Sequence, residues 1–129
     1  MTPIHGDGHS ATIARRDTSG RILVYLDAAP QEGAETLSNF PTFRIAHNEV
    51  VSKDVHRDAA AVGLRFVDAV GSCVIDRYTT RVKSNRYREI ACYVQGPTTA
   101  SVIVAAALES EWTRALPLLE RAVSVYRAR

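Results

Sequence analysis

Long hydrophobic runs are missing from this sequence of 129 residues. The longest unbroken apolar stretch, Val102–Leu108, has seven residues, whereas a helix that spans a membrane needs about 20. The residues after Met1 form neither a basic leader nor an apolar segment, so no secretory signal is visible. Proline and glycine are also scarce, with 5 and 7 residues, which excludes collagen-like and low-complexity chains. These absences predict a cytosolic protein that does not span a membrane.

Lysine is nearly absent. Of the 16 basic residues, 14 are Arg, and only Lys53 and Lys83 are Lys. Arginine offers a planar fork of donors that suits phosphate and carboxylate groups. The formal net charge is only +2, so total charge favours no class of partner. The positions of the arginines, rather than their number, carry the information.

Cysteine and catalytic signatures are scarce too. Cys73 and Cys92 are the only cysteines, and neither lies in a C-x-x-C motif or beside a histidine. In the hairpin predicted below they are offset by roughly 10–13 Å along the strands, beyond the limit of about 7 Å for a disulfide. We therefore expect free thiols, which suit the cytosol. The sequence contains no G-x-S-x-G, no glycine-rich phosphate loop and no H-E-x-x-H. The sequence therefore predicts a protein that is not an enzyme and that has no cofactor and no metal site.

What is present predicts a single α+β domain over residues 10–129, after a flexible N-terminus over residues 1–9. A hairpin is expected within Ser10–Asp27, with its turn at Asp17–Gly20. A short strand is expected at Pro41–Ala46. One apolar stripe predicts a helix over Asp54–Val70.

The second half of the sequence predicts another hairpin and a final helix. Cys73–Val82 and Arg86–Gln95 are rich in Val, Ile, Thr and Tyr, which is typical of strands. The segment Val102–Val104 is compatible with a strand or with a buried helix. A last helix carries Pro117, so a break is expected near Ser110–Thr113. The predicted order is β-β-β-α-β-β-α, an antiparallel sheet of about five strands with helices packed on one face.

The second hairpin is the most informative segment. Residues 77–88 contain five basic residues and no acidic one, with two tyrosines between them. We predict that this basic hairpin binds a macromolecular partner through Arg77, Tyr78, Arg81, Lys83, Arg86, Tyr87 and Arg88. Such a ribbon suits an acidic protein surface. It also suits a nucleic acid, whose phosphates would meet the cations while bases stack on the tyrosines.

The face that these cations occupy depends on the register of the hairpin. A two-residue turn at Ser84-Asn85 would pair Arg81 with Arg88 and Lys83 with Arg86. Like charges would then lie opposite one another, which is destabilising unless an anion relieves them. A three-residue loop would instead pair Tyr78 with Ile90 and divide the cations between the two faces. The second register gives the cleaner apolar face and is preferred.

Three further patterns have functional interpretations. The residues spaced 4, 3, 4, 3 along the last helix form either a core seam or the interface of a homodimer: Trp112, Leu116, Leu119, Val123 and Tyr126. Asp27, Glu49 and Asp76 are acids that a metal-dependent hydrolase could use. His5 and His9 resemble a metal clip, but two glycines between them leave no fixed geometry, so no metal site is predicted there.

The charge distribution leads to the functional prediction. Residues 27–54 contain five acids and two bases, whereas residues 77–88 contain five bases and no acid. Complementary patches of this kind favour oriented association. The sequence therefore predicts a small non-enzymatic interaction protein, an adaptor, inhibitor or regulator. Nucleic-acid binding and metal-dependent hydrolysis are the alternatives.

Overall fold

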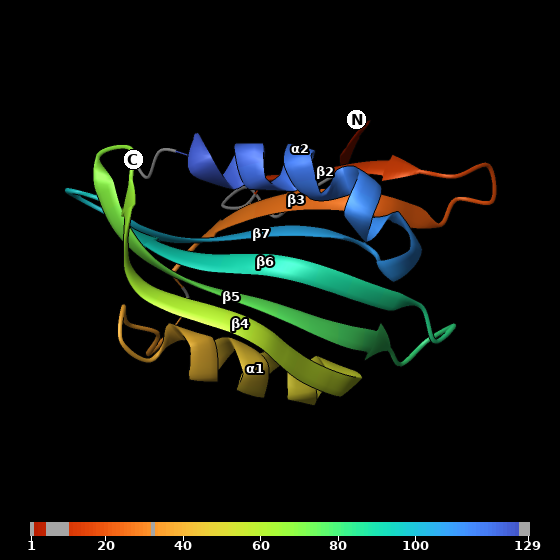
Figure 1. Cartoon of the computed structure of the whole chain (residues 1–129), viewed down its shortest axis with the longest axis horizontal. Helices are drawn as coiled ribbons and strands as arrows, with labels where there is room; N and C mark the ends of the chain where they lie inside the picture. Colours follow the sequence, from red (N-terminus) through yellow and green to blue (C-terminus); the bar gives the residue numbers. More distant parts are fainter. Residues whose placement is uncertain (1, 5–10, 32, 127–129) are drawn as a thin grey trace.

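A computed structural model shows one antiparallel sheet with a helix on each face (Figure 1), and it describes residues 2–4, 11–31 and 33–126. The seven strands lie in the order β1-β2-β3-β7-β6-β5-β4. Their bounds are β1 Thr2–Ile4, β2 Ala11–Arg16, β3 Ile22–Pro30, β4 Ser52–Phe66, β5 Ala69–Thr80, β6 Arg86–Gln95 and β7 Ala100–Leu108. The helices are α1, Phe40–Val51, and α2, Trp112–Ser124, which a short 3-10 turn at Glu109–Glu111 precedes.

The α+β class is confirmed, whereas the strand count and the helix placement were predicted wrongly. The sheet has seven strands rather than about five, and α1 and α2 lie on opposite faces of it. Thr2–Ile4 pairs with β2 as strand β1. The rest of the predicted flexible N-terminus, residues 1 and 5–9, lies outside the described residues, and so do His5 and His9.

The first hairpin forms as the sequence predicts. Its turn depends on Asp17, whose main-chain oxygen accepts the N–H of Gly20 at 3.0 Å. The Asp17 carboxylate also accepts the N–H groups of Ser19 and Arg21. Gly20 has a φ of +87°, a conformation that glycine adopts at little cost. The local conformational preferences of these residues therefore explain this turn.

Helix α1 occupies the segment for which the sequence predicted a strand. Pro41 lies in its first turn, where a missing N–H costs nothing. Phe40, Arg44 and Asn48 follow one another at helical spacing, and the side chains of Phe40 and Asn48 are buried against the sheet. Two of these three residues are polar, so the sequence lacks the apolar periodicity by which a helix is usually identified.

Strand β4 occupies the segment for which the sequence predicted a helix over Asp54–Val70. It is an edge strand, and its pairing with β5 shifts register at three places. Asp54 and Gly63 have positive φ values of 53° and 69° near two of these shifts. Each shift breaks the alternation of apolar and polar residues that identifies a strand. The apolar residues of this segment therefore fall at spacings that resemble a helical stripe.

Strand β7 resolves the ambiguity over Val102–Val104 in favour of a strand. It lies at the centre of the sheet, between β3 and β6, and its residues from Ile103 to Leu108 are buried. The final helix α2 begins at Trp112, within the predicted break at Ser110–Thr113, and contains Pro117. It packs on β7, β6 and β3, whereas α1 packs on β4, β5 and β6 of the opposite face. Each helix thus covers one half of its face.

The second hairpin is confirmed, but neither predicted register is found. Tyr78 pairs with Tyr87, and Arg77 pairs with Arg88. As a result Cys73 lies directly opposite Cys92, and the two form a disulfide. The prediction of free thiols was therefore wrong. A structural disulfide is typical of oxidising compartments, so the thiol argument no longer supports a cytosolic location, which stays a prediction.

Candidate functional site

The tip of the second hairpin is longer than the sequence predicts. Strand β5 ends at Thr80 and β6 begins at Arg86, so residues 81–85 form the loop. The main-chain N–H of Thr80 donates to the oxygen of Asn85 at 2.8 Å, and the N–H of Asn85 donates to Thr80 Oγ1 at 2.9 Å. Lys83 and Ser84 have positive φ values. This loop length, which simple turn rules do not give, sets the register of the whole hairpin.

Both tyrosines of the predicted site point into the molecule. The rings of Tyr78 and Tyr87 stack with their centres 5.9 Å apart. The Tyr78 hydroxyl lies 2.7 Å from that of Tyr25, and Tyr87 Oη donates to the main-chain oxygen of Ile22 at 2.8 Å. Burial raises the pKa values of Tyr25, Tyr78 and Tyr87. These rings stabilise the sheet and are not positioned to stack on bases.

Arg77 and Arg88 are neutralised within the protein. They lie opposite each other on β5 and β6, and the carboxylates of Asp58 and Glu109 form ion pairs with both. The Arg88 guanidinium also lies 5.4 Å from the centre of the Trp112 ring, within range of a cation–π contact. The like-charge repulsion across the strands is thus relieved internally.

The remaining cations of the predicted site gather at the hairpin tip, beside exposed valines. Arg81 Nη2 donates to the main-chain oxygen of Glu49 at 3.3 Å, which places the loop against the end of α1. Lys53 Nζ donates to Ser84 Oγ at 3.1 Å. Val50 is 77% exposed and Val82 is 76% exposed. We call this surface the tip patch, and it comprises Val50, Lys53, Arg81, Val82, Lys83 and Arg86.

Sequence reasoning missed half of the tip patch. Val50 and Lys53 come from the end of α1 and the start of β4, two elements whose type was predicted wrongly. Val82 was visible between Arg81 and Lys83, and an apolar residue flanked by two cations is a signal that could have identified it.

A buried polar cluster ties α1 to the sheet. Arg44 Nε and Nη2 donate to the two carboxylate oxygens of Glu89 at 2.8 and 2.9 Å. Asn48 Nδ2 donates to Asp76 Oδ1 at 3.0 Å and to Glu89 Oε2 at 3.2 Å. Asp76 and Glu89 face each other across β5 and β6, and neither has any solvent exposure.

The two buried carboxyl groups titrate in opposite directions. Burial, followed by the negative charge of Glu89, raises the pKa of Asp76 to about 9. Burial alone would also raise the pKa of Glu89, but the charge and hydrogen bonds of Arg44 lower it instead. Asp76 Oδ2 is buried and has no hydrogen-bond partner among the described residues, so no contact compensates a negative charge on it. The raised pKa of Asp76 favours its protonated form at neutral pH, whereas the lowered pKa of Glu89 favours the carboxylate.

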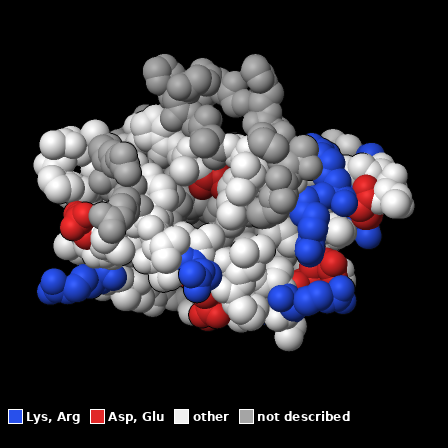
Figure 2. Space-filling view, turned by 90° about the horizontal axis from the view of Figure 1, so that it is seen from above, with Lys and Arg blue, Asp and Glu red and all other residues white. Residues whose placement is uncertain are grey.

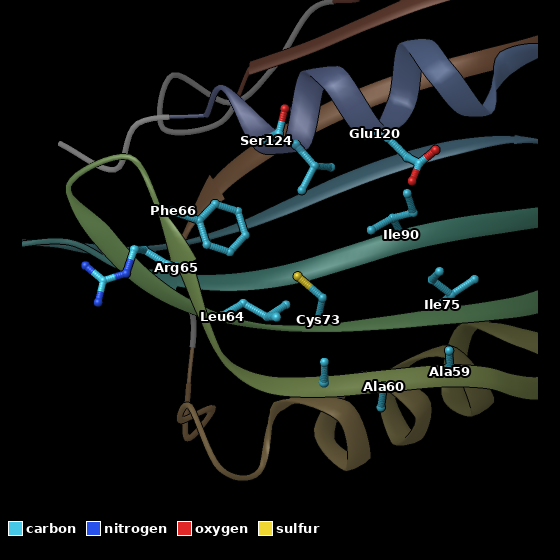
Figure 3. A pocket seen from close by; sticks show the side chains of 12 residues that line it. Ala59, Ala60, Leu64, Arg65, Phe66, Cys73, Ile75, Ile90, Glu120 and Ser124 are labelled. Atoms are coloured by element: carbon cyan, nitrogen blue, oxygen red, sulfur yellow. The ribbon is translucent and has the colours of Figure 1, made fainter.

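The half of the sheet that α2 leaves uncovered forms an apolar groove of about 420 Å³ (Figure 3). Leu64, Phe66 and Ile75 lie along it, together with Cys73 of the disulfide. Glu120 of α2 reaches toward Ile90 from the opposite wall. Seen from above, Lys and Arg lie in separate groups, with Asp or Glu beside several of them (Figure 2).

The other predicted residues do not assemble into a site. The five seam residues, four on α2 and Tyr126 just after it, pack on the sheet as part of the monomer's own core, and a homodimer stays a prediction. Asp27 lies on β3, Glu49 on α1 and Asp76 in the buried cluster. The described residues contain no group of three His, Cys, Asp or Glu that could hold a metal ion. Neither described helix is long and apolar enough to cross a membrane.

Comparisons with known proteins show the fold but no family. No family model and no curated protein matches this sequence. Among solved structures, PA94 from Pseudomonas aeruginosa is similar, with a TM-score of 0.71 over 100% of this chain and 97% of that chain. PA94 is a protein of unknown function for which a regulatory role has been suggested. Sequence identity is 6%, so the chain shares the fold of this protein, and the likeness extends no further.

Proposed function

We propose that this protein is a small non-enzymatic binding protein, a regulator or adaptor, that docks an acidic partner protein through the tip patch. The observation that carries the proposal is the meeting of exposed cations with two valines that are about three-quarters exposed. Water-exposed aliphatic side chains that gather beside charges are typical of interaction surfaces. The fold shared with a suggested regulator is compatible with this role.

The contacts favour a protein partner over a nucleic acid. The tyrosines that would stack on bases are packed inside the sheet. Arg77 and Arg88 already have carboxylate partners, so three of the five hairpin cations remain for a partner. Lys53 of β4 lies beside them and adds a fourth cation. Burial of Val50 and Val82 stabilises a complex only where the partner offers apolar surface. An acidic surface with apolar side chains fits both properties, and the cations would accelerate the encounter.

Titration with synthetic polymers tests the proposal without a known partner. The probes are polyglutamate, a glutamate–tyrosine copolymer and duplex DNA, each at about 50 and 200 mM salt. We expect the copolymer to bind most tightly, because it offers both carboxylates and rings. The double variant Lys83→Glu/Arg86→Glu should weaken copolymer binding by about tenfold or more. Val82→Ser should weaken binding of the copolymer and leave binding of polyglutamate unchanged.

A matched variant separates the tip patch from general charge. Arg57→Glu/Arg65→Glu makes the same change in charge on exposed residues of the edge strand β4, and it should bind the copolymer like the natural protein. Equal losses in both double variants would refute the site. Absence of binding to either acidic polymer at low salt would refute the proposal, and tighter binding of DNA would replace it with the nucleic-acid alternative.

A further inference from the structure

We propose that the cleft beside α1 binds a small zwitterion, a molecule such as an amino acid or dipeptide that carries both an ammonium and a carboxylate group. The cleft lies over the half of the sheet that α1 leaves uncovered, and none of its lining residues belongs to the tip patch. The inference is therefore independent of the proposed function.

Two adjoining cavities form this cleft. They have volumes of about 170 and 390 Å³, and both are lined by Asp27, Arg44, His47 and Val104. Ligand sites of small molecules are commonly concave, with an apolar floor and a few convergent polar groups. Here β3 and β7 supply the floor and α1 supplies one wall. The size suits a ligand of a few to about a dozen heavy atoms rather than a macromolecule.

The wall from α1 supplies donors for a carboxylate. Arg44 uses Nε and Nη2 on Glu89, and its Nη1 has no hydrogen bond to another described residue, so this group could serve a ligand. The Arg44–Glu89 pair also holds the guanidinium in place, and a fixed donor loses less entropy on binding. His47 follows three residues later on α1 and lines the same two cavities. Together these two side chains form the end of the cleft that would receive an anion.

Two carboxylates supply acceptors for an ammonium. Asp27 Oδ1 accepts the hydroxyl of Thr12, and its Oδ2 accepts no hydrogen bond from residues 11–31 or 33–126. Glu35 is buried beside the smaller cavity, and its Oε1 accepts the N–H of Gly33 at 2.7 Å. Its second oxygen has no hydrogen bond within the described part of the chain. An ammonium offers three donors and would satisfy these free oxygens.

The polar groups at the two ends of the cleft do not pair with each other, because the ion pair of Arg44 is with Glu89. Within residues 11–31 and 33–126, no salt bridge joins Asp27 or Glu35 to Arg44 or His47, although all four line one cavity. A guanidinium at one end and carboxylates at the other match a ligand that carries both an ammonium and a carboxylate itself. Val102, Val104 and Phe43 between them would contact its apolar part.

Isothermal titration calorimetry and amide NMR test the inference with five probes: L-leucine, glycyl-leucine and three controls. The controls are 4-methylpentanoate, which lacks the ammonium, isoamylamine, which lacks the carboxylate, and sodium chloride. We expect one of the two zwitterions to bind and to shift amide signals of β3 and α1. Each half-analogue should bind at least about tenfold more weakly, since it leaves one set of charges unpaired.

Variants locate the ligand within the cleft. Asp27→Asn and His47→Ala should each weaken binding of the zwitterion by about tenfold, and His47→Ala should leave binding of isoamylamine unchanged. The matched controls Asp54→Asn and His56→Ala change the same residue types on the exposed strand β4, and they should bind like the natural protein. Failure of both zwitterions to bind would overturn the inference. So would equal binding of the half-analogues, or amide shifts confined to another face.

Discussion

At the scale of single residues, the Asp76–Glu89 pair makes the stability of this protein depend on pH. In the unfolded chain Asp76 ionises near its ordinary pKa of 3.8, whereas in the folded protein it keeps its proton to about pH 9. Between these values the folded state binds one more proton than the unfolded state, so the free energy of unfolding falls as the pH rises. Glu89 acts in the opposite sense, because its pKa is lowered on folding. Its contribution is lost only as acidification protonates it.

We therefore expect the protein to be more stable at pH 5 than at pH 8. One proton over three pH units changes the free energy of unfolding by at most about 4 kcal/mol. Asp76→Asn removes this titrating group and keeps the shape of the side chain, so its free energy of unfolding should change less between pH 5 and pH 8. Compared with the natural protein, the variant should be most stable at pH 8. Urea unfolding of both proteins at the two pH values measures the difference. The exposed control Asp54→Asn should retain the natural slope, and an equal slope in Asp76→Asn would contradict the assignment of the proton.

Arg44 gives a second prediction at the residue scale. Its side chain is 15% exposed, and its partner Glu89 is fully buried. Arg44→Met leaves the Glu89 carboxylate without its ion pair, which should lower the free energy of unfolding by about 3–5 kcal/mol. The double variant Arg44→Met/Glu89→Gln removes both charges and should recover much of this loss. Urea midpoints of the three proteins measure the coupling, and additive losses would show that the pair does not act as a unit.

At the scale of elements, the sequence predicted strands and turns whose signals are local. The Asp17–Gly20 turn and the two strands of the second hairpin follow from residue preferences. Helix α1 was missed because its buried row contains Arg44 and Asn48, which only a polar cluster on the sheet can accommodate. Strand β4 was missed because three register shifts break its alternation.

The same limits apply to the candidate site. The basic hairpin was visible in the sequence, but the acids that neutralise Arg77 and Arg88 were not. Asp58 comes from β4, the segment predicted as a helix, and Glu109 follows β7. Which arginines stay free depends on these distant partners and on a five-residue loop. Tertiary contacts, rather than local pattern, determine both.

The prediction at this scale concerns the stability of the hairpin of β5 and β6. The disulfide between Cys73 and Cys92 joins residues 19 apart in the sequence. Closing a loop of this size restricts the unfolded chain and typically stabilises a protein by about 3 kcal/mol. Cys73→Ala/Cys92→Ala should lower the urea midpoint accordingly, with little change in circular dichroism. Addition of a reductant should not shift the midpoint of this variant further. An unchanged midpoint without reductant would show that the bond is not formed in solution.

At the scale of the whole molecule, β7 joins two halves that are distant in the sequence. It pairs with β3 on one side, from Val24↔Ala107 to Pro30↔Ser101, and with β6 on the other. The N-terminal strands are therefore joined to β4, β5 and β6 only through β7, which comes from the C-terminal third of the sequence. Neither half can bury its apolar faces alone, because the cores on both faces of the sheet include β7.

We expect this topology to give one cooperative unfolding transition and slow folding. Fluorescence of Trp112, the single tryptophan, reports on α2 and the core beneath it, whereas tyrosine circular dichroism reports on the cluster of Tyr25, Tyr78 and Tyr87. The two signals should change with the same urea midpoint. Refolding should take milliseconds to seconds, since sheets built from distant segments close long loops before they gain contacts. Two separate midpoints would show instead that the halves of the sheet unfold independently, and that β7 does not couple them.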